Sequence, residues 1–144
     1  MLCGGVIQMS VVRSKRSSSG VEFIHTAREL QIYTIQKCAG FPKRYTFYVS
    51  EHLAASATRI HEFVKMANSV FPKNQHEAQI RRDYLIRANA ELYSLVSQIE
   101  VAQELFQIEH DKVKHWMDIV DREINLVKAV MRSDEARYKD LPNT

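Results

Sequence analysis

Glycine and proline are scarce in this sequence, and their positions exclude a β-rich fold. All four glycines lie within the first 40 residues, and none occurs after Gly40. The prolines are Pro42, Pro72 and Pro142. A β-rich domain of this length needs many turns, and turns favour Gly, Pro, Asn and Asp. The small number of turn-forming residues therefore predicts a few long helices.

Long apolar runs and cysteines are also few, and this scarcity indicates the cellular compartment in which we expect the protein. No run approaches the roughly 18 apolar residues that a membrane-spanning helix needs, so we expect no membrane partner. The basic residues near the N-terminus follow the apolar start instead of preceding it, unlike a secretory signal, whether translation begins at Met1 or at Met9. Cys3 and Cys38 give no disulfide framework. We therefore expect a cytoplasmic protein with reduced thiols.

Charge is unevenly distributed along the chain, although the formal net charge is only +3. Residues 37–87 hold nine basic and four acidic residues, a formal charge of +5. Residues 100–144 hold seven basic and ten acidic residues, a formal charge of −3. The first of these two segments is the one that favours an anionic partner.

Apolar residues recur with steps of four and three in three long segments, as on the buried stripe of a helix. They are Leu53, Ala57, Ile60, Val64, Ala67 and Phe71, then Leu85, Ala88, Leu92, Leu95, Ile99, Ala102 and Phe106, and then Val113, Met117, Val120, Ile124, Val127 and Met131. A fourth, less regular segment holds Phe23, Ala27, Leu30 and Thr34. Such stripes pack at crossing angles of about 20°, and short connections make neighbours antiparallel.

The predicted fold is therefore all-α, an antiparallel up-and-down four-helix bundle over residues 19–144 with a flexible N-terminal tail over residues 1–18. We expect helices at about 21–38, 44–71, 75–108 and 112–132, with Tyr138 as an alternative end of the last helix. The expected end signals are a capping box at Ser19 and Glu22, a left-handed Gly40, a cap at Asn74 with Glu77, and a cap at Asp111.

Catalytic and metal-binding patterns are weak. The glycines are in the wrong places for a phosphate-binding loop. Glu22 and His25 have the spacing of half a di-metal site, and no second pair of this kind follows. Cys38 is either a reactive thiol near a helix end or a small buried hydrophobe. We therefore predict no enzyme activity, no metal and no cofactor.

Basic residues of the second and third predicted helices are the candidate nucleic-acid-binding residues. They are Lys43, Arg44, Arg59, Lys65, Lys73, Arg81, Arg82 and Arg87. In an antiparallel pair these residues would form a basic stripe that could follow a phosphate backbone. The alternative is an ordinary solvated face, partly paired with Glu62, Glu77 and Asp83.

An aromatic group offers a second candidate surface. Trp116, Met117, Tyr93 and Tyr84 could form a platform on which bases stack. Residues with this helical spacing more often belong to the core or to a subunit interface.

Residues 37–68 carry a resemblance to a known family. Their sequence is KCAGFPKRYTFYVSEHLAASATRIHEFVKMAN, with a Phe-Pro-Lys turn, a Tyr-Thr-Phe opening and an Ala- and Ser-rich helix that contains Arg59. This pattern resembles the second helix of a four-helix-bundle family. The family includes proteins encoded in intervening sequences of bacterial large-subunit rRNA genes and the accessory variability determinant of diversity-generating retroelements. The resemblance extends over residues 21–138.

The resemblance implies a homopentameric ring with a basic surface, to which Lys43, Arg44 and Arg59 are the best-matched positions. In the accessory determinants this ring binds the reverse transcriptase and nucleic acid, and supports copying of template RNA into cDNA. We therefore expect a non-enzymatic accessory protein that binds RNA or DNA and a reverse transcriptase in mutagenic retrohoming. The alternative is a protein-only oligomeric interaction module of the rRNA-intervening-sequence branch.

Overall fold

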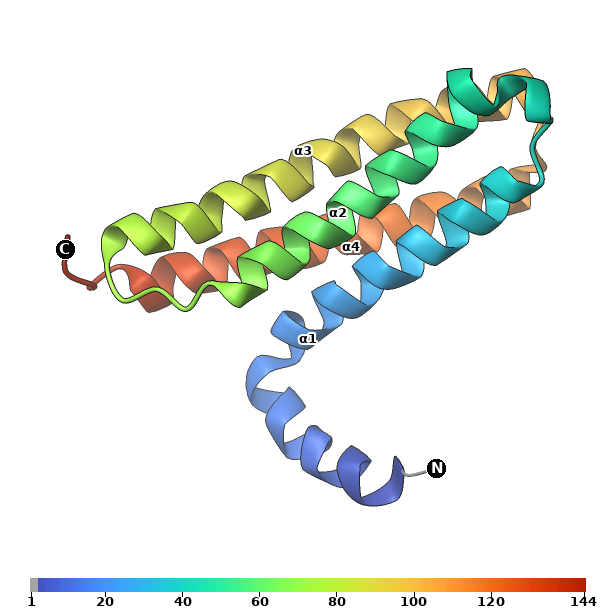
Figure 1. Cartoon of the computed structure of the whole chain (residues 1–144). Coiled ribbons are helices and arrows are strands. Elements are labelled where there is room, and N and C mark those ends of the chain that lie inside the picture. Colours follow the sequence, from blue (N-terminus) through green and yellow to red (C-terminus); the bar gives the residue numbers. More distant parts are fainter. Residues whose placement is uncertain (1–2) are drawn as a thin grey trace.

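The computed structural model describes the backbone of residues 3–144 and the side chains of residues 21–144. This part of the chain is helical and contains no strand. Its elements are α1 (Cys3–Ala39), the 3₁₀ turn η1 (Lys43–Tyr45), the π-helical turn η2 (Thr46–Ser50), α2 (Glu51–Ser69), α3 (Gln75–Phe106) and α4 (His110–Tyr138). The long helices pack along one another (Figure 1). The all-α prediction with four long helices is therefore confirmed.

The predicted apolar stripes form the core. In α2 the stripe from Leu53 to Ala67 is buried, as is the stripe from Leu85 to Ala102 in α3. In α4, Val120 and Val127 are fully buried, while Met117 and Met131 pack against the core from its edge. These helices stay together because each would otherwise expose a continuous apolar face to water.

One member of the predicted stripes is misplaced. Phe71 was expected to continue the buried face of α2, but its side chain is 77% exposed. The helix ends at Ser69, and Val70 has the extended φ and ψ angles of −94° and 119°. The helical periodicity that would bury Phe71 therefore stops before this residue.

The irregular segment of α1 is buried as expected. Phe23, Ala27, Leu30 and Thr34 are all fully inaccessible to solvent. The hydroxyl of Thr34 accepts a hydrogen bond of 2.9 Å from the indole N–H of Trp116 on α4. A polar residue is tolerated on this stripe because its partner satisfies it.

The start of α1 differs from the prediction. The helix begins at Cys3 and not near Val21, and its N-terminal part extends away from the other helices (Figure 1). Ser19 and Glu22 therefore do not stand at a helix start. The flexible tail expected over residues 1–18 is not confirmed, and its first two residues lie outside the described part of the chain.

The connection between α1 and α2 also departs from the prediction. Gly40 does not have a positive φ angle, so it is not the expected left-handed residue. Its N–H bonds to the carbonyl of Lys37 at 3.1 Å, which closes the last turn of α1. Beyond Pro42, the expected single helix is divided into η1, η2 and α2.

Helix α3 begins as predicted. The Asn74 side-chain oxygen accepts a hydrogen bond of 2.9 Å from the Glu77 N–H, and the Glu77 carboxylate accepts one of 2.8 Å from the Lys73 N–H. This arrangement satisfies amides at the helix start that have no helical partner. The predicted helix start near residue 75 is therefore confirmed.

The connection between α3 and α4 differs from the prediction in its end signals. Gln107, with a φ angle of 51°, is the left-handed residue that terminates α3. Helix α4 begins at His110 with Glu109 at its N-cap, so Asp111 lies in the first turn and is not the cap. The helix continues to Tyr138, which was the alternative end.

None of the helices in the described residues is both long enough and apolar enough to cross a membrane.

Candidate nucleic-acid interface

The eight basic residues proposed from the sequence do not form one stripe in the structure. Lys43 and Arg44 lie where α1 connects to α2, whereas Lys73 lies in the connection between α2 and α3 at the opposite end of the bundle (Figure 1). Arg59 and Lys65 belong to α2, and α3 carries Arg81, Arg82 and Arg87. Each group therefore has its own environment.

Arg81 is a structural residue of the bundle. Only 6% of it is exposed, and its Nε lies 2.6 Å from a carboxylate oxygen of Asp134 on α4. Its Nη1 donates to the carbonyls of Ala67 and Val70 at 2.9 Å and 3.3 Å. Because its guanidinium is directed inward and occupied, Arg81 does not present a cation to a phosphate.

Arg59 and Arg82 are more exposed, and each has a carboxylate partner. Arg59 Nε lies 2.9 Å from Glu91 on α3, and Arg82 lies 3.8 Å from Glu135 on α4. A phosphate would have to compete with these carboxylates. Arg59 and Arg82 are therefore weaker candidates for phosphate binding than the sequence indicated.

Lys65 lies close enough to His61 to affect its pKa, as does Arg28 of α1. Burial lowers the pKa of His61, and the charges of Lys65 on α2 and Arg28 on α1 lower it further, while Glu62 opposes them. The His61 ring also lies 2.7 Å from the Gln31 side-chain oxygen. Lys65 thus faces the α1 side of α2, away from Arg59, whose partner is on α3.

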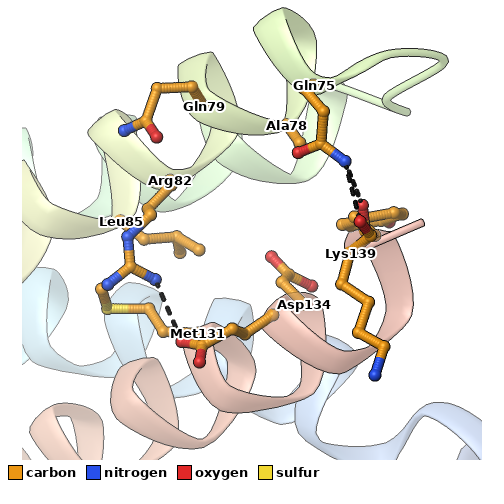
Figure 2. Close-up of a pocket in the computed structure, with 10 residues that line it drawn as sticks. Gln75, Ala78, Gln79, Arg82, Leu85, Met131, Asp134 and Lys139 are labelled. Carbon is orange, nitrogen blue, oxygen red and sulfur yellow. Dashed lines mark hydrogen bonds and ion pairs between the residues drawn. The ribbon is translucent and has the colours of Figure 1, made fainter. Parts of the chain in front are cut away.

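A cleft of about 390 Å³ lies between the start of α3 and the end of α4. Figure 2 shows Gln75 directed toward the segment that follows α4, where its amide donates to the carbonyls of Tyr138 and Leu141 at 2.9 Å and 3.0 Å. Arg82 and Lys139 contribute cations to this cleft, and Asp134 and Glu135 contribute carboxylates. The balanced charge gives the cleft no preference for an anion.

Lys43 and Arg44 are the accessible cations nearest to the start of α2. Both are exposed, and neither forms an ion pair with a residue in the described part of the chain. The Arg44 guanidinium lies 5.3 Å from the centre of the Tyr45 ring. Lys65, Lys73 and Arg87 also form no ion pair with a described residue. These three residues lie in different elements, however, whereas Lys43 and Arg44 are adjacent. Lys43 and Arg44 are therefore the strongest candidates for phosphate binding in the predicted set.

The predicted aromatic platform is not formed. Trp116 is fully buried and hydrogen-bonded to Thr34, so it belongs to the core, as the alternative interpretation held. Tyr84 and Met117 also pack against the core. Tyr93 is half-exposed, and its hydroxyl accepts a hydrogen bond of 3.0 Å from Lys128.

A different aromatic pair is exposed beside the basic pair. Phe47 is 77% exposed and Tyr48 is 79% exposed, although both stand in a helical turn that leads into α2. Sequence reasoning missed them because it treated this turn as the first part of a regular helix. The available signal was the short segment KRYTFY, in which two basic residues precede three aromatic ones.

Tyr48 stands at the edge of a second cleft, of about 310 Å³, between α2 and α3. The polar lining of this cleft comes from His52 on α2 and from Ser94, Ser97 and Gln98 on α3. Hydroxyl, amide and imidazole groups can hydrogen-bond to the sugars and phosphates of a nucleic acid. Together, Lys43, Arg44, Phe47, Tyr48 and this cleft form what we call the η-turn surface.

Neither a metal-binding cluster nor an activated thiol is found in the part of the chain that the structure describes. No three His, Cys, Asp or Glu side chains there are arranged to hold a metal ion. Burial raises the pKa of the Cys38 thiol to about 11, although a backbone hydrogen bond opposes this shift. A thiol with this pKa is mainly protonated near neutral pH, so Cys38 is a poor nucleophile.

A scan against models of protein families finds no match to this chain, and searches of curated proteins and of solved structures find none either.

Proposed function

We propose that this protein is a non-enzymatic scaffold that binds nucleic acid through the η-turn surface. The observation that carries the proposal is the pair Lys43 and Arg44, which are exposed and without ion-pair partners among the described residues. When such cations bind phosphates, the counterions that surround the nucleic acid are released, and this release favours binding. The proposal includes RNA and DNA, since phosphate contacts do not distinguish them.

The scaffold in this proposal is an antiparallel up-and-down bundle that assembles into a homo-oligomer. Bonds between α2 and α3 support the antiparallel course, because Ser56 bonds to Gln98, Arg59 to Glu91 and Ala67 to Arg81. As positions rise along α2, their partners fall along α3. The resemblance of residues 37–68 to the accessory determinants supports a cytoplasmic role beside a reverse transcriptase, with a pentamer as the expected assembly.

The salt dependence of binding tests this proposal. On single-stranded nucleic acid, each neutralised phosphate contributes about −0.7 to the slope of log K against log salt concentration. The double variant Lys43→Glu, Arg44→Glu should weaken binding strongly and make this slope shallower by about 1.4, twice that value, for each protomer that contacts the strand. Fluorescence anisotropy of a labelled oligonucleotide with the full chain measures both quantities.

A matched control separates local contacts from net charge. The variant Arg137→Glu, Lys139→Glu also lowers the formal net charge from +3 to −1, but at the opposite end of the bundle. It should bind nearly as well as the natural protein. Equal loss of binding in the two double variants would show that the η-turn surface is not the binding site.

A protein-only interaction module is the second candidate function. It is favoured by large apolar side chains exposed at the same end of the bundle, since Val101 on α3 is 54% exposed and Leu105 is 50% exposed. Exposed apolar residues near Phe47 and Tyr48 could equally contact a protein. Sedimentation with and without RNA separates this candidate from the first, because a protein-only module would sediment identically in both samples.

A further inference from the structure

The exposed rings of Phe47 and Tyr48 contribute little to the core of this protein. Both side chains are more than three-quarters exposed, whereas the next two residues, Val49 and Ser50, are buried. Phe47 and Tyr48 belong to the π-helical turn over Thr46–Ser50, which directly precedes the α-helix that begins at Glu51. Turns of this kind occur often at functional sites. Two adjacent rings that a fold leaves in water are candidates for contact with a ligand.

Two exposed cations precede the two rings closely in the chain. Lys43 precedes Phe47 by four residues, and Arg44 precedes Tyr48 by four residues. The two cations lie in η1 and the two rings lie in η2, which follows η1 directly, so all four residues belong to the same short connection before α2. The surface therefore combines phosphate-binding cations with aromatic faces, which is the combination that proteins use to bind single strands.

Exposed aromatic rings are the feature that can distinguish a single strand from a duplex. In a duplex, the faces of the bases are covered by stacking with their neighbours, so an external ring cannot reach them. In a single strand, the bases can turn outward and stack on aromatic side chains. Cations alone would bind both forms, because both carry phosphates.

We infer that the η-turn surface binds single-stranded nucleic acid, with bases stacked on Phe47 and Tyr48 and phosphates bound to Lys43 and Arg44. This inference rests on the proposed function and specifies its ligand. The adjoining cleft extends the surface from Tyr48 along α2 and α3, where Ser94 and Ser97 offer hydroxyl groups to the backbone of the strand.

The test compares an unstructured oligonucleotide of about 16 nucleotides with a duplex of the same length, using the full-length protein. The double variant Phe47→Ala, Tyr48→Ala should bind the single strand at least about tenfold more weakly, because each stacked base contributes roughly 1–3 kcal/mol. Its affinity for the duplex should change by less than about twofold, because duplex contacts do not use the rings.

Two further variants make the result specific. Phe47→Leu, Tyr48→Leu keeps apolar side chains but removes the aromatic faces, so it should lose single-strand affinity almost as the alanine variant does. Phe71→Ala removes a ring that is also 77% exposed but follows α2, at the opposite end of that helix. It should leave both affinities unchanged.

The outcomes separate this inference from the proposed function. Equal binding of single strand and duplex, unaffected by loss of the rings, would overturn the inference and leave phosphate binding intact. Ring variants that change the oligomeric state without changing single-strand affinity would assign Phe47 and Tyr48 to a protein contact and also overturn the inference. No binding to either form at low salt would refute the proposed function itself.

Discussion

Arg81 and Asp134 form a charged pair inside the bundle, with side-chain exposures of 7% and 13%. Their contact joins α3 to α4, and the remaining guanidinium bonds reach the last turn of α2. Sequence analysis placed Arg81 with the surface cations because its type and spacing are the same as theirs. Its burial depends on which residues of α2 and α4 lie opposite, and a linear sequence does not contain this information directly.

Replacing Arg81 should destabilise the protein severely. Arg81→Met leaves the Asp134 carboxylate, which is only 13% exposed, without its cation, and breaking a fully buried pair, the upper bound for this one, costs about 3–5 kcal/mol. Arg82→Met is the matched control, because Arg82 is 44% exposed and lies 3.8 Å from Glu135. It should cost less than about 1 kcal/mol. Urea unfolding measures both values, and equal costs would contradict the structural role of Arg81.

Besides Arg81, Glu123 is the other charged residue among the buried residues of the described part of the chain. Its side chain is fully buried, and neither carboxyl oxygen has a hydrogen-bond partner. The pKa of Glu123 is raised to about 9, mainly by burial, while Arg122 lowers it and Glu22 of α1 raises it. The folded protein therefore holds this carboxyl protonated near neutral pH, whereas the unfolded chain ionises it near its ordinary value of 4.5.

Stability should therefore fall as pH rises. Because the folded state retains a proton that the unfolded state loses, the free energy of unfolding should fall by up to about 1.4 kcal/mol per pH unit. This contribution is greatest below pH 4.5 and is lost as the pH approaches about 9. Urea unfolding at several values between about pH 7 and 8.5, above the usual histidine range, isolates it. Trp116, the single tryptophan, reports the transition from its buried position.

Glu123→Gln should remove this pH dependence and raise stability near pH 8, because an amide cannot ionise. Glu100→Gln, which changes an exposed residue of α3, should keep the dependence of the natural protein. If the natural protein and Glu123→Gln have the same slope, the ionisation of Glu123 is not linked to folding.

At the scale of elements, helix ends determine how well the sequence predicts the structure. The start of α3 could be predicted because Asn74 and Glu77 satisfy local amides through bonds within one turn. The division of residues 43–69 into a 3₁₀ turn, a π turn and an α-helix could not be predicted. The same residues fit a continuous helix locally, and the packing of Val49 and Tyr45 against the core accompanies the irregular path.

Removing the cap of α3 should weaken the whole bundle. Asn74→Ala deletes the oxygen that accepts the Glu77 N–H, and such losses typically cost about 0.5–2 kcal/mol. Asn125→Ala is the matched control, since Asn125 is exposed within α4 and alanine favours helices. It should be neutral or slightly stabilising in thermal or urea unfolding. A neutral Asn74→Ala would mean that the cap makes no contribution.

At the scale of the whole molecule, the apolar stripes made the all-α fold and most of its core predictable. The candidate site was less predictable, because pairing between helices decides which cations remain accessible. Arg59 is paired with Glu91, which lies on a different helix, while Lys43 and Arg44 stay without a described ion pair. Such pairing depends on the relative rotation and axial position of the helices, which the periodicity of one helix does not define.

Sedimentation velocity of the full chain with a fluorescent single-stranded RNA tests most directly whether this bundle is a nucleic-acid scaffold. At about 50 mM salt the RNA should sediment with the protein, and at about 200 mM the bound fraction should be clearly smaller, because two phosphate contacts alone lose about sevenfold in affinity over this change in salt. Lys43→Glu, Arg44→Glu should abolish co-sedimentation at the lower salt concentration. RNA that sediments alone at both salt concentrations, beside an unchanged protein boundary, would contradict the account.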